Sequence, residues 1–242
     1  MCANNPVNAI DPNGMEIYYL PDGTCLGQLG DNEDIRVINS MKGKDARSHF
    51  ESGSEESIAA LMDGSVAFAD YFTPVNDVTN NAALVRYGEV LDANGRPNCK
   101  LSADKQMSNA GYKDKGSDVA IQTKVSTDSN LSSDAIGGAI SLQTDLMNGK
   151  PVIIGVEQSL GSAVVAPVGN TNELTTHFVV VRSVTVQNGI VSFNYLDNGT
   201  RLGKSPSNNL TLNISTGAIT GYMSARNVNY HVSEVRRSSR IR

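Results

Sequence analysis

The sequence predicts an α+β fold, in which helices pack on an antiparallel β meander and a small β unit comes first. Three observations favour this class. Helical patterns fall between about residues 55 and 147, whereas apolar, strand-like runs dominate from residue 152 onward. Asn188-Gly189 follows the most apolar run and is typical of a two-residue hairpin turn. Helices and strands that are segregated along a chain are typical of α+β folds.

The N-terminal part is expected to be a small β linker unit over residues 15–45. Its expected strands are 15–20, 24–29 and 35–38, with Pro21-Asp22-Gly23 turning between the first two. Charged residues 40–56 show no periodicity, which predicts a loop. A helix is expected from about Glu55, weakened at Gly64 and stopped at Pro74.

Three further helices are expected before the meander. Residues 82–90 form a short one. Cys99 to Ala110 forms the second, with Asn98 as its N-cap and Gly111 beyond its end. Asp134 is placed to cap the third, which ends at Asn148-Gly149. The polar residues 112–132 are expected to be a surface loop.

The last third is expected to be β structure in an antiparallel meander. The expected strands are 152–156, 177–186, 190–196, 210–214 and 218–224. Arginines gather after residue 235 and are expected to be a solvated tail, with contact to an acidic partner or phosphate as the alternative.

Composition excludes several classes of function. The 242 residues have a formal net charge of −5 and no Trp, which argues against nucleic-acid binding. No apolar run approaches the roughly 20 residues of a membrane helix, and no secretory signal opens the chain. Three His and three scattered Cys give no metal-ligand spacing, and no glycine-rich phosphate loop follows a strand, so neither metal nor cofactor is expected.

Three residues fall in an order that predicts nucleophilic catalysis. Cys99 lies at the start of a helix, where the helix dipole and unpaired N–H groups favour the thiolate. His177 opens an apolar strand, and Asp197 ends the strand that returns from the hairpin. Antiparallel pairing would set His177 beside Asp197, so that the carboxylate holds one ring nitrogen and the other faces the thiol.

Other polar residues are candidates for supporting roles. Asn198 is an alternative to Asp197 as the orienting residue, and Asn94 or Asn98 could stabilise an oxyanion together with the N–H groups of the helix start. Lys100 would favour the thiolate if it points inward. Each residue also has a structural interpretation: Cys99 as a small buried side chain, His177 as a strand-end histidine, and Asp197-Asn198-Gly199 as a plain turn.

Two resemblances sharpen the functional expectation. Residues 4–15, Asn-Asn-Pro-Val-Asn-Ala-Ile-Asp-Pro-Asn-Gly-Met, resemble the motif that closes the repeat shell of Rhs/YD-repeat proteins. That resemblance implies that residues 1–14 are a shell remnant and that a variable C-terminal effector follows. An ordinary Pro/Asn-rich loop is the alternative interpretation of this segment.

Residues 95–200 resemble papain-like cysteine peptidases of the bacteriocin-leader-processing group. The matching stretches are the helix at Cys99 with its terminal Gly-Tyr, Asn148-Gly-Lys-Pro-Val-Ile-Ile-Gly-Val156, Thr176-His-Phe-Val-Val-Val181 and Asn194-Tyr-Leu-Asp-Asn-Gly199. The resemblance implies a nucleophile at Cys99, a base at His177 and an orienting residue at Asp197. The Gln that usually precedes the Cys in the family is absent, and Asn198 stands where the family has Pro.

These observations predict a papain-like cysteine hydrolase over residues 55–242, acting as an antibacterial effector. It would cleave an amide bond in a target-cell protein, by proteolysis or deamidation, or in a peptidoglycan peptide. The Rhs resemblance implies delivery by a contact-dependent, type VI-like system and a cognate immunity protein. A non-catalytic papain-like module that docks a target protein is the alternative. A nuclease would need a carboxylate/His metal cluster, which the sequence does not offer.

Overall fold

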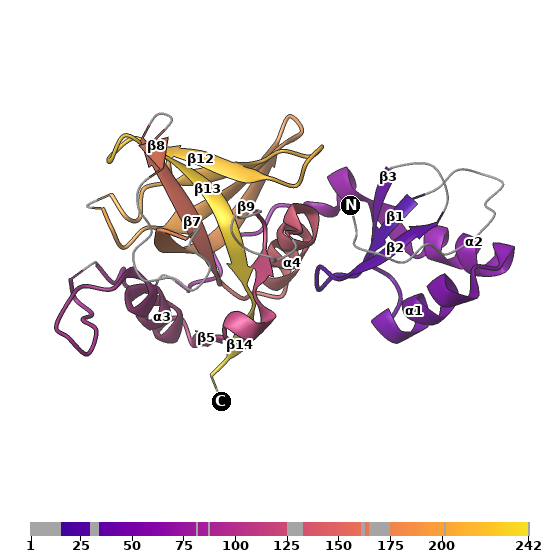
Figure 1. Cartoon of the computed structure of the whole chain (residues 1–242), viewed down its shortest axis with the longest axis horizontal. Coiled ribbons are helices and arrows are strands. Elements are labelled where there is room, and N and C mark those ends of the chain that lie inside the picture. The colour runs from indigo at the N-terminus through magenta and orange to yellow at the C-terminus, as the bar shows by residue number, and fades with distance from the viewer. Residues whose placement is uncertain are drawn as a thin grey trace. The chain divides into compact units, whose positions relative to one another are not determined.

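The computed structural model describes residues 16–29, 34–80, 82–86, 88–124, 133–160, 163–164, 175–200 and 202–241. The chain divides into two compact units, with the boundary between Phe72 and Thr73. Helices and a mostly antiparallel sheet confirm the α+β class (Figure 1). The Rhs-like segment lies outside the described residues.

The N-terminal unit is a four-stranded sheet in the order β2-β1-β3-β4, accompanied by two helices. Its central strands β1 and β3 are parallel, and the other pairs are antiparallel. The elements are β1 (Glu16–Tyr19), β2 (Cys25–Leu29), β3 (Asp34–Ile38), α1 (Gly43–Ser52), α2 (Glu55–Asp63), β4 (Ser65–Ala67) and the 3-10 turn η1 (Phe68–Tyr71).

Two expectations for this unit are wrong. Residues 43–52 form α1 rather than a loop. Only Ala46 and Phe50 of that helix are buried, which is too few apolar positions to give a periodic pattern. Helix α2 ends at Asp63, with Gly64 as its C-cap, instead of continuing to Pro74. Ile58 of α2 packs in the same hydrophobic cluster as the N-terminal strands.

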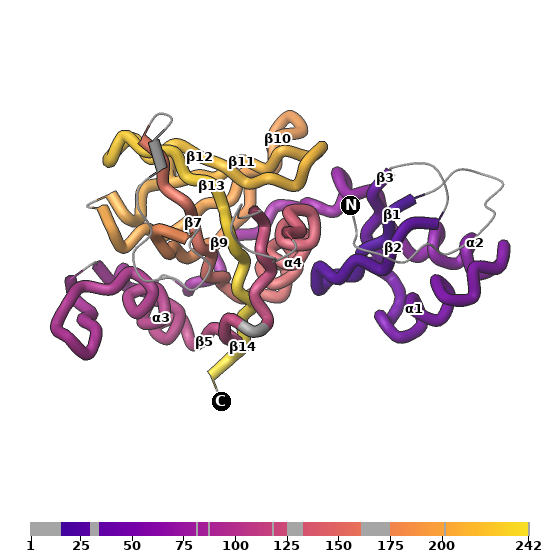
Figure 2. The backbone as a smooth tube through the Cα atoms, viewed as in Figure 1, coloured from indigo at the N-terminus to yellow at the C-terminus, as the bar shows by residue number. Residues whose placement is uncertain are grey.

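The C-terminal unit is built on a closed six-stranded antiparallel barrel. Its strands follow the order β13-β12-β11-β10-β9-β7, and β13 also pairs with β7, which closes the sheet. Strand β7 pairs with β9 along one edge and with β13 along the other, and Figure 2 shows its chain running beside that of β13. The barrel strands are β7 (Val152–Leu160), β9 (His177–Gln187), β10 (Ile190–Leu196), β11 (Asn209–Leu212), β12 (Ile219–Met223) and β13 (Val228–Arg236).

Helices and short strands flank this barrel. They are α3 (Cys99–Asn109), β5 (Tyr112–Asp114), the 3-10 turn η2 (Ser117–Val119), β6 (Ile121–Gln122), α4 (Ala135–Met147), β8 (Ala163–Val164) and β14 (Ser238–Arg240). A buried cluster joins α3 to β7, β9 and β10; its members are Ala103, Met107, Tyr112, Ile153, Phe178, Val180 and Leu196. Burial of this apolar surface fixes the start of α3 against the barrel wall.

The turn and cap signals of the sequence are confirmed. Asn188 and Gly189 adopt φ angles of 51° and 77°, as a hairpin turn of this kind requires. The side chains of Asn98 and Asp134 accept N–H groups in the first turns of α3 and α4. These signals are local, so the sequence contains all the information they need.

Three expectations for the C-terminal unit are wrong. Residues 82–86 and 88–90 contain no helix. Residues 112–122 include β5 and β6 and are not entirely loop. Arg236 and Arg240 do not belong to a free tail, because β13 reaches Arg236 and β14, which ends at Arg240, pairs with β5; Arg242 lies outside the described residues. These short strands form by pairing with strands that are distant along the chain, and no local periodicity in the sequence predicts such pairing.

Candidate active site

Cys99 is the first residue of α3. The Asn98 side chain accepts the N–H of Leu101 at 3.0 Å, which fixes where the helix begins. The first N–H groups of a helix have no partners within it, and the positive end of its dipole lies there. Cys99 is half-buried against the α3–barrel cluster and is free, whereas Cys25 is in a disulfide. The thiol is therefore accessible at the end of a helix that favours an anion.

His177 and Asp197 meet because β9 and β10 are antiparallel neighbours. Their register pairs Leu196 with Val180, so the end of β10 returns to the start of β9. His177 Nε2 donates to Asp197 Oδ1 at 2.9 Å, and both side chains are buried. A carboxylate only accepts, so the ring proton is on Nε2 and Nδ1 is left for the Cys99 thiol, which is hydrogen-bonded to His177.

The Asp197 carboxylate is buried yet has donors on both oxygens. Gly199 N–H donates to Oδ1 at 2.7 Å, and the Tyr230 hydroxyl donates to Oδ2 at 2.9 Å. Gln158 in turn donates to the Tyr230 hydroxyl oxygen at 3.3 Å. Burial raises the pKa of Asp197, but the hydrogen bond and positive charge of His177, with these donors, lower it to below its usual value.

Cys99 and His177 shift each other's pKa in opposite directions. Burial raises the pKa of the Cys99 thiol, but the hydrogen bond and charge of His177 outweigh it, and the net pKa is lowered. Burial lowers the pKa of His177, but hydrogen bonds to Asp197 and Cys99, and the charges of both, raise it to about 9. At neutral pH the arrangement favours a thiolate beside an imidazolium.

Asn198 joins the three elements that hold these groups. Its Nδ2 donates to the carbonyl oxygen of Cys99 at 3.1 Å and to that of Phe178 at 3.2 Å. The amide therefore ties the start of α3 to the start of β9, directly beside Asp197. The contact with the His177 ring is made by Asp197, so Asn198 does not take the orienting position that the sequence left open to it.

The two asparagines expected to face an oxyanion have other positions. The Asn98 carboxamide oxygen caps α3. Asn94 is exposed in the loop that precedes α3, and its N–H donates to Asp92 Oδ1 at 2.8 Å. The unpartnered N–H groups at the start of α3 remain as donors near the sulfur.

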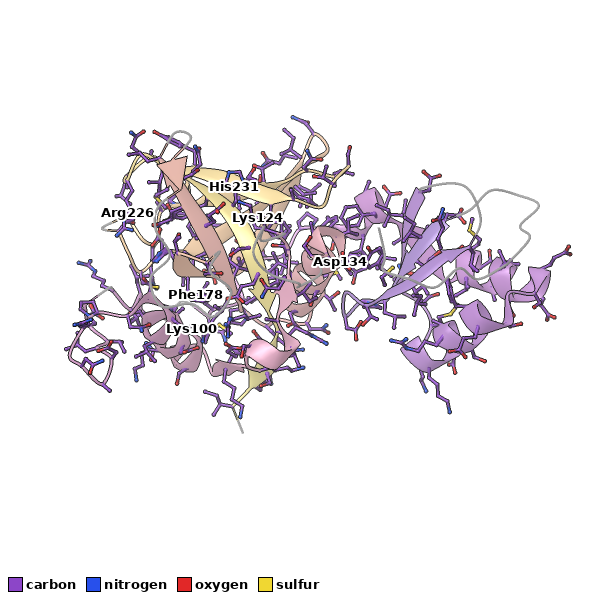
Figure 3. The ribbon with its side chains drawn as sticks, in the orientation of Figure 1. Lys100, Lys124, Asp134, Phe178, Arg226 and His231 are labelled. Atoms are coloured by element: carbon purple, nitrogen blue, oxygen red, sulfur yellow. The ribbon has the colours of Figure 1, made fainter. Side chains whose placement is uncertain are left out.

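Lys100 points to carboxylates rather than to the thiol. Its ammonium pairs with Asp104 and lies 2.9 Å from Asp114, which also pairs with Arg236 of β13 at 3.0 Å. Lys100 and Arg236 both lie over the ring of Phe178, 5.9 Å and 5.2 Å from its centroid. Figure 3 labels Lys100 and Phe178 next to each other beside α3. This network fastens the residues after Cys99 and His177 to the barrel.

Comparison of the chain with protein-family models, with curated proteins and with solved structures found no match. Within the described ranges, no helix has the length and apolar character of a membrane span, and no group of three or more His, Cys, Asp or Glu is arranged to hold a metal ion. The local geometry alone therefore supports the functional argument.

Sequence reasoning did not find Tyr230 or the connecting role of Asn198. Tyr230 reaches Asp197 from β13, which the barrel brings close although it is more than thirty residues away along the chain. The contact between Tyr230 and Asp197 depends on the pairing of β13 with β7, which no local sequence pattern predicts. The turn motif from Asn194 to Gly199 indicates that Asn198 lies near the site, but it does not predict that Asn198 donates to the carbonyls of Cys99 and Phe178.

Proposed function

We propose that this protein is a papain-like cysteine hydrolase that cleaves an amide bond. One observation supports the proposal above all: the imidazole of His177 is hydrogen-bonded to the carboxylate of Asp197 at 2.9 Å and interacts with the thiol of Cys99, whose pKa it lowers. A nucleophile, a base and an orienting acceptor in this order are the requirements of acyl transfer through a covalent intermediate. The helical start of α3 and the barrel wall behind it are compatible with a papain-like arrangement.

The proposed reaction has two steps, formation of a thioester on Cys99 and its hydrolysis by water. The Cys99 thiolate forms an S–C bond to the substrate carbonyl, while N–H groups at the start of α3 stabilise the oxyanion. His177 then gives its proton to the leaving amine as the C–N bond breaks. In the second step His177 takes a proton from water, which attacks the thioester and releases the acid and the free thiol. Asp197 keeps the ring in the required tautomer and stabilises the imidazolium.

The biological setting follows from the Rhs-like segment at residues 4–15. We propose an antibacterial effector that reaches a target cell through a contact-dependent system and is neutralised by an immunity protein in the producing cell. Its substrate is a target-cell protein or a peptidoglycan peptide, and the acidic net charge of the chain favours a protein.

Replacement of the nucleophile tests the proposal. Cys99→Ala should remove toxicity toward a bacterium that lacks the inhibitor, and amide hydrolysis should fall by about 10³-fold or more, because the covalent step is lost. Ser108→Ala is the matched control, since Ser108 is exposed on the same helix and should change neither. Undiminished toxicity of a folded Cys99→Ala variant would favour the docking module instead.

A further inference from the structure

Arg226 is an exposed cation with unused hydrogen-bonding capacity. It lies in the turn between β12 and β13, and its Nη2 donates to the carbonyl oxygen of Gly199 at 2.7 Å. Arg182 and Arg236 are paired with carboxylates, whereas no carboxylate of the described residues pairs with Arg226. A guanidinium has five N–H donors in a fixed fork, so most of its capacity remains for a ligand.

Arg226 lies next to the His177–Asp197 pair. A Cβ built on Gly199 would be 3.1 Å from each of three atoms, namely Arg226 Nη2, Asp197 Oδ1 and His177 Cε1. Because both atoms lie 3.1 Å from the same point, Arg226 Nη2 and His177 Cε1 are separated by no more than twice 3.1 Å.

The direction of proton transfer decides which half of the substrate would meet Arg226. His177 protonates the leaving amine, so that amine must lie on the imidazole side of the sulfur. The acyl half extends the other way. A charge beside the imidazole consequently faces the leaving half of the substrate.

We propose that Arg226 binds a carboxylate on the leaving half, so that the site prefers amides whose amine portion is acidic. This proposal rests on the proposed hydrolase function. Carboxylates match the guanidinium fork with two parallel hydrogen bonds, and Arg226 is poised for that without breaking an existing ion pair. The carboxylate can belong to an acidic side chain just after the cleaved bond or to a free C-terminus.

Two alkylating reagents test the proposal without knowledge of the natural substrate. Iodoacetate carries a carboxylate and iodoacetamide is its neutral analogue. At low ionic strength, Arg226→Gln should lower the ratio of the two Cys99 alkylation rates, iodoacetate over iodoacetamide, by about 5-fold, and salt should reduce the difference. Lys105→Gln is the control, because it removes an equal charge from an exposed site on α3 and should leave the ratio unchanged.

Each result has one meaning. If Arg226 only fastens the Gly199 turn, both reagents will slow together, and an unchanged ratio overturns the proposal while Cys99 remains a reactive thiolate. If wild-type Cys99 reacts no faster than an ordinary thiol at pH 7, the hydrolase function falls, and this inference falls with it.

Internally quenched peptides with mixed acyl halves then distinguish the source of the carboxylate. One set has Glu directly after the cleaved bond, one ends there in a free carboxylate, and one is neutral. If the wild-type protein cleaves the first set fastest and Arg226→Gln loses this preference, the carboxylate that Arg226 binds is an acidic side chain. If the second set behaves in this way, the carboxylate is that of a free C-terminus. Equal cleavage of all three sets, or cleavage of none, overturns the proposal.

Discussion

At the scale of single residues, the proposed chemistry depends on Cys99 and His177, which shift each other's pKa. The thiol of Cys99 is partly buried and the imidazole of His177 is buried, and burial alone would favour the neutral form of each group. Their hydrogen bond and opposite charges reverse that preference. Asp197 supplies the remaining negative charge, so the imidazolium is held between two acceptors.

This coupling predicts an unusual pH dependence. Because the pKa of Cys99 is lowered, its alkylation by iodoacetamide should reach its plateau at a lower pH than that of an ordinary thiol, whose pKa is about 8.5. Amide hydrolysis should fall toward acid as the thiolate is protonated, and toward alkali as His177 loses its proton near pH 9. In His177→Ala the alkylation rate at pH 7 should drop about 10-fold. An unchanged profile would contradict the coupling.

The carboxylate beneath the ring gives a second prediction at this scale. Asp197→Asn should lower kcat by about 10³- to 10⁴-fold, since an amide can favour the wrong imidazole tautomer. Tyr230→Phe removes the donor to Asp197 Oδ2 and the acceptor for Gln158, and should cost about 1–3 kcal/mol of stability with a smaller loss of rate. Kinetics and urea unfolding of both variants measure this. Equal losses of rate would show that Asp197 has no separate role in orienting the ring.

At the scale of elements, the site is a junction of α3, β9 and β10. The apolar cluster presses α3 on the barrel, and β9–β10 pairing sets His177 beside Asp197. The Asn198 amide adds a polar link between the elements, because it donates to the carbonyl of Cys99 at the start of α3 and to that of Phe178 in β9.

Loss of this amide should therefore affect both stability and reactivity. Asn198→Ala leaves two carbonyl groups without their donor, and we expect a loss of about 2–4 kcal/mol in unfolding free energy together with slower Cys99 alkylation. Asn213→Ala is a suitable control: Asn213 stabilises the β11–β12 turn through N–H groups of Ser215 and Thr216. It should lower stability without altering alkylation. Parallel behaviour of the two variants would show that Asn198 is merely structural.

At the scale of the whole molecule, the site belongs to one unit. Cys99, His177, Asp197 and Tyr230 all follow the boundary at Thr73, and the barrel closes within that unit. The N-terminal unit has its own hydrophobic cluster, built from its strands and its two helices. Each unit therefore has the core that independent folding requires.

Truncation tests this independence. A fragment of residues 73–242 should unfold cooperatively and keep the iodoacetamide reactivity of Cys99 within about 2-fold of the full chain, because the described contacts of the site lie inside it. Circular dichroism and alkylation kinetics would measure both properties. A fragment that is folded but unreactive would show that the first unit is needed to shape the site.

Local sequence patterns predict the caps at Asn98 and Asp134, the hairpin at Asn188-Gly189, and the pairing that sets His177 beside Asp197. Each depends on residues close in sequence or joined by one tight turn. Helix α1 was not predicted because only two of its side chains are buried. Strands β13 and β14 were not predicted because the strands that pair with them are distant along the chain.

No local pattern predicts that the meander closes into a barrel, because closure depends on the long-range pairing of β7 with β13. That pairing brings Tyr230 to Asp197, and the turn ahead of β13 brings Arg226 to Gly199. The physical reason is that strand pairing uses backbone groups common to every residue, so distant partners are selected by the packing of the whole sheet and not by a local pattern.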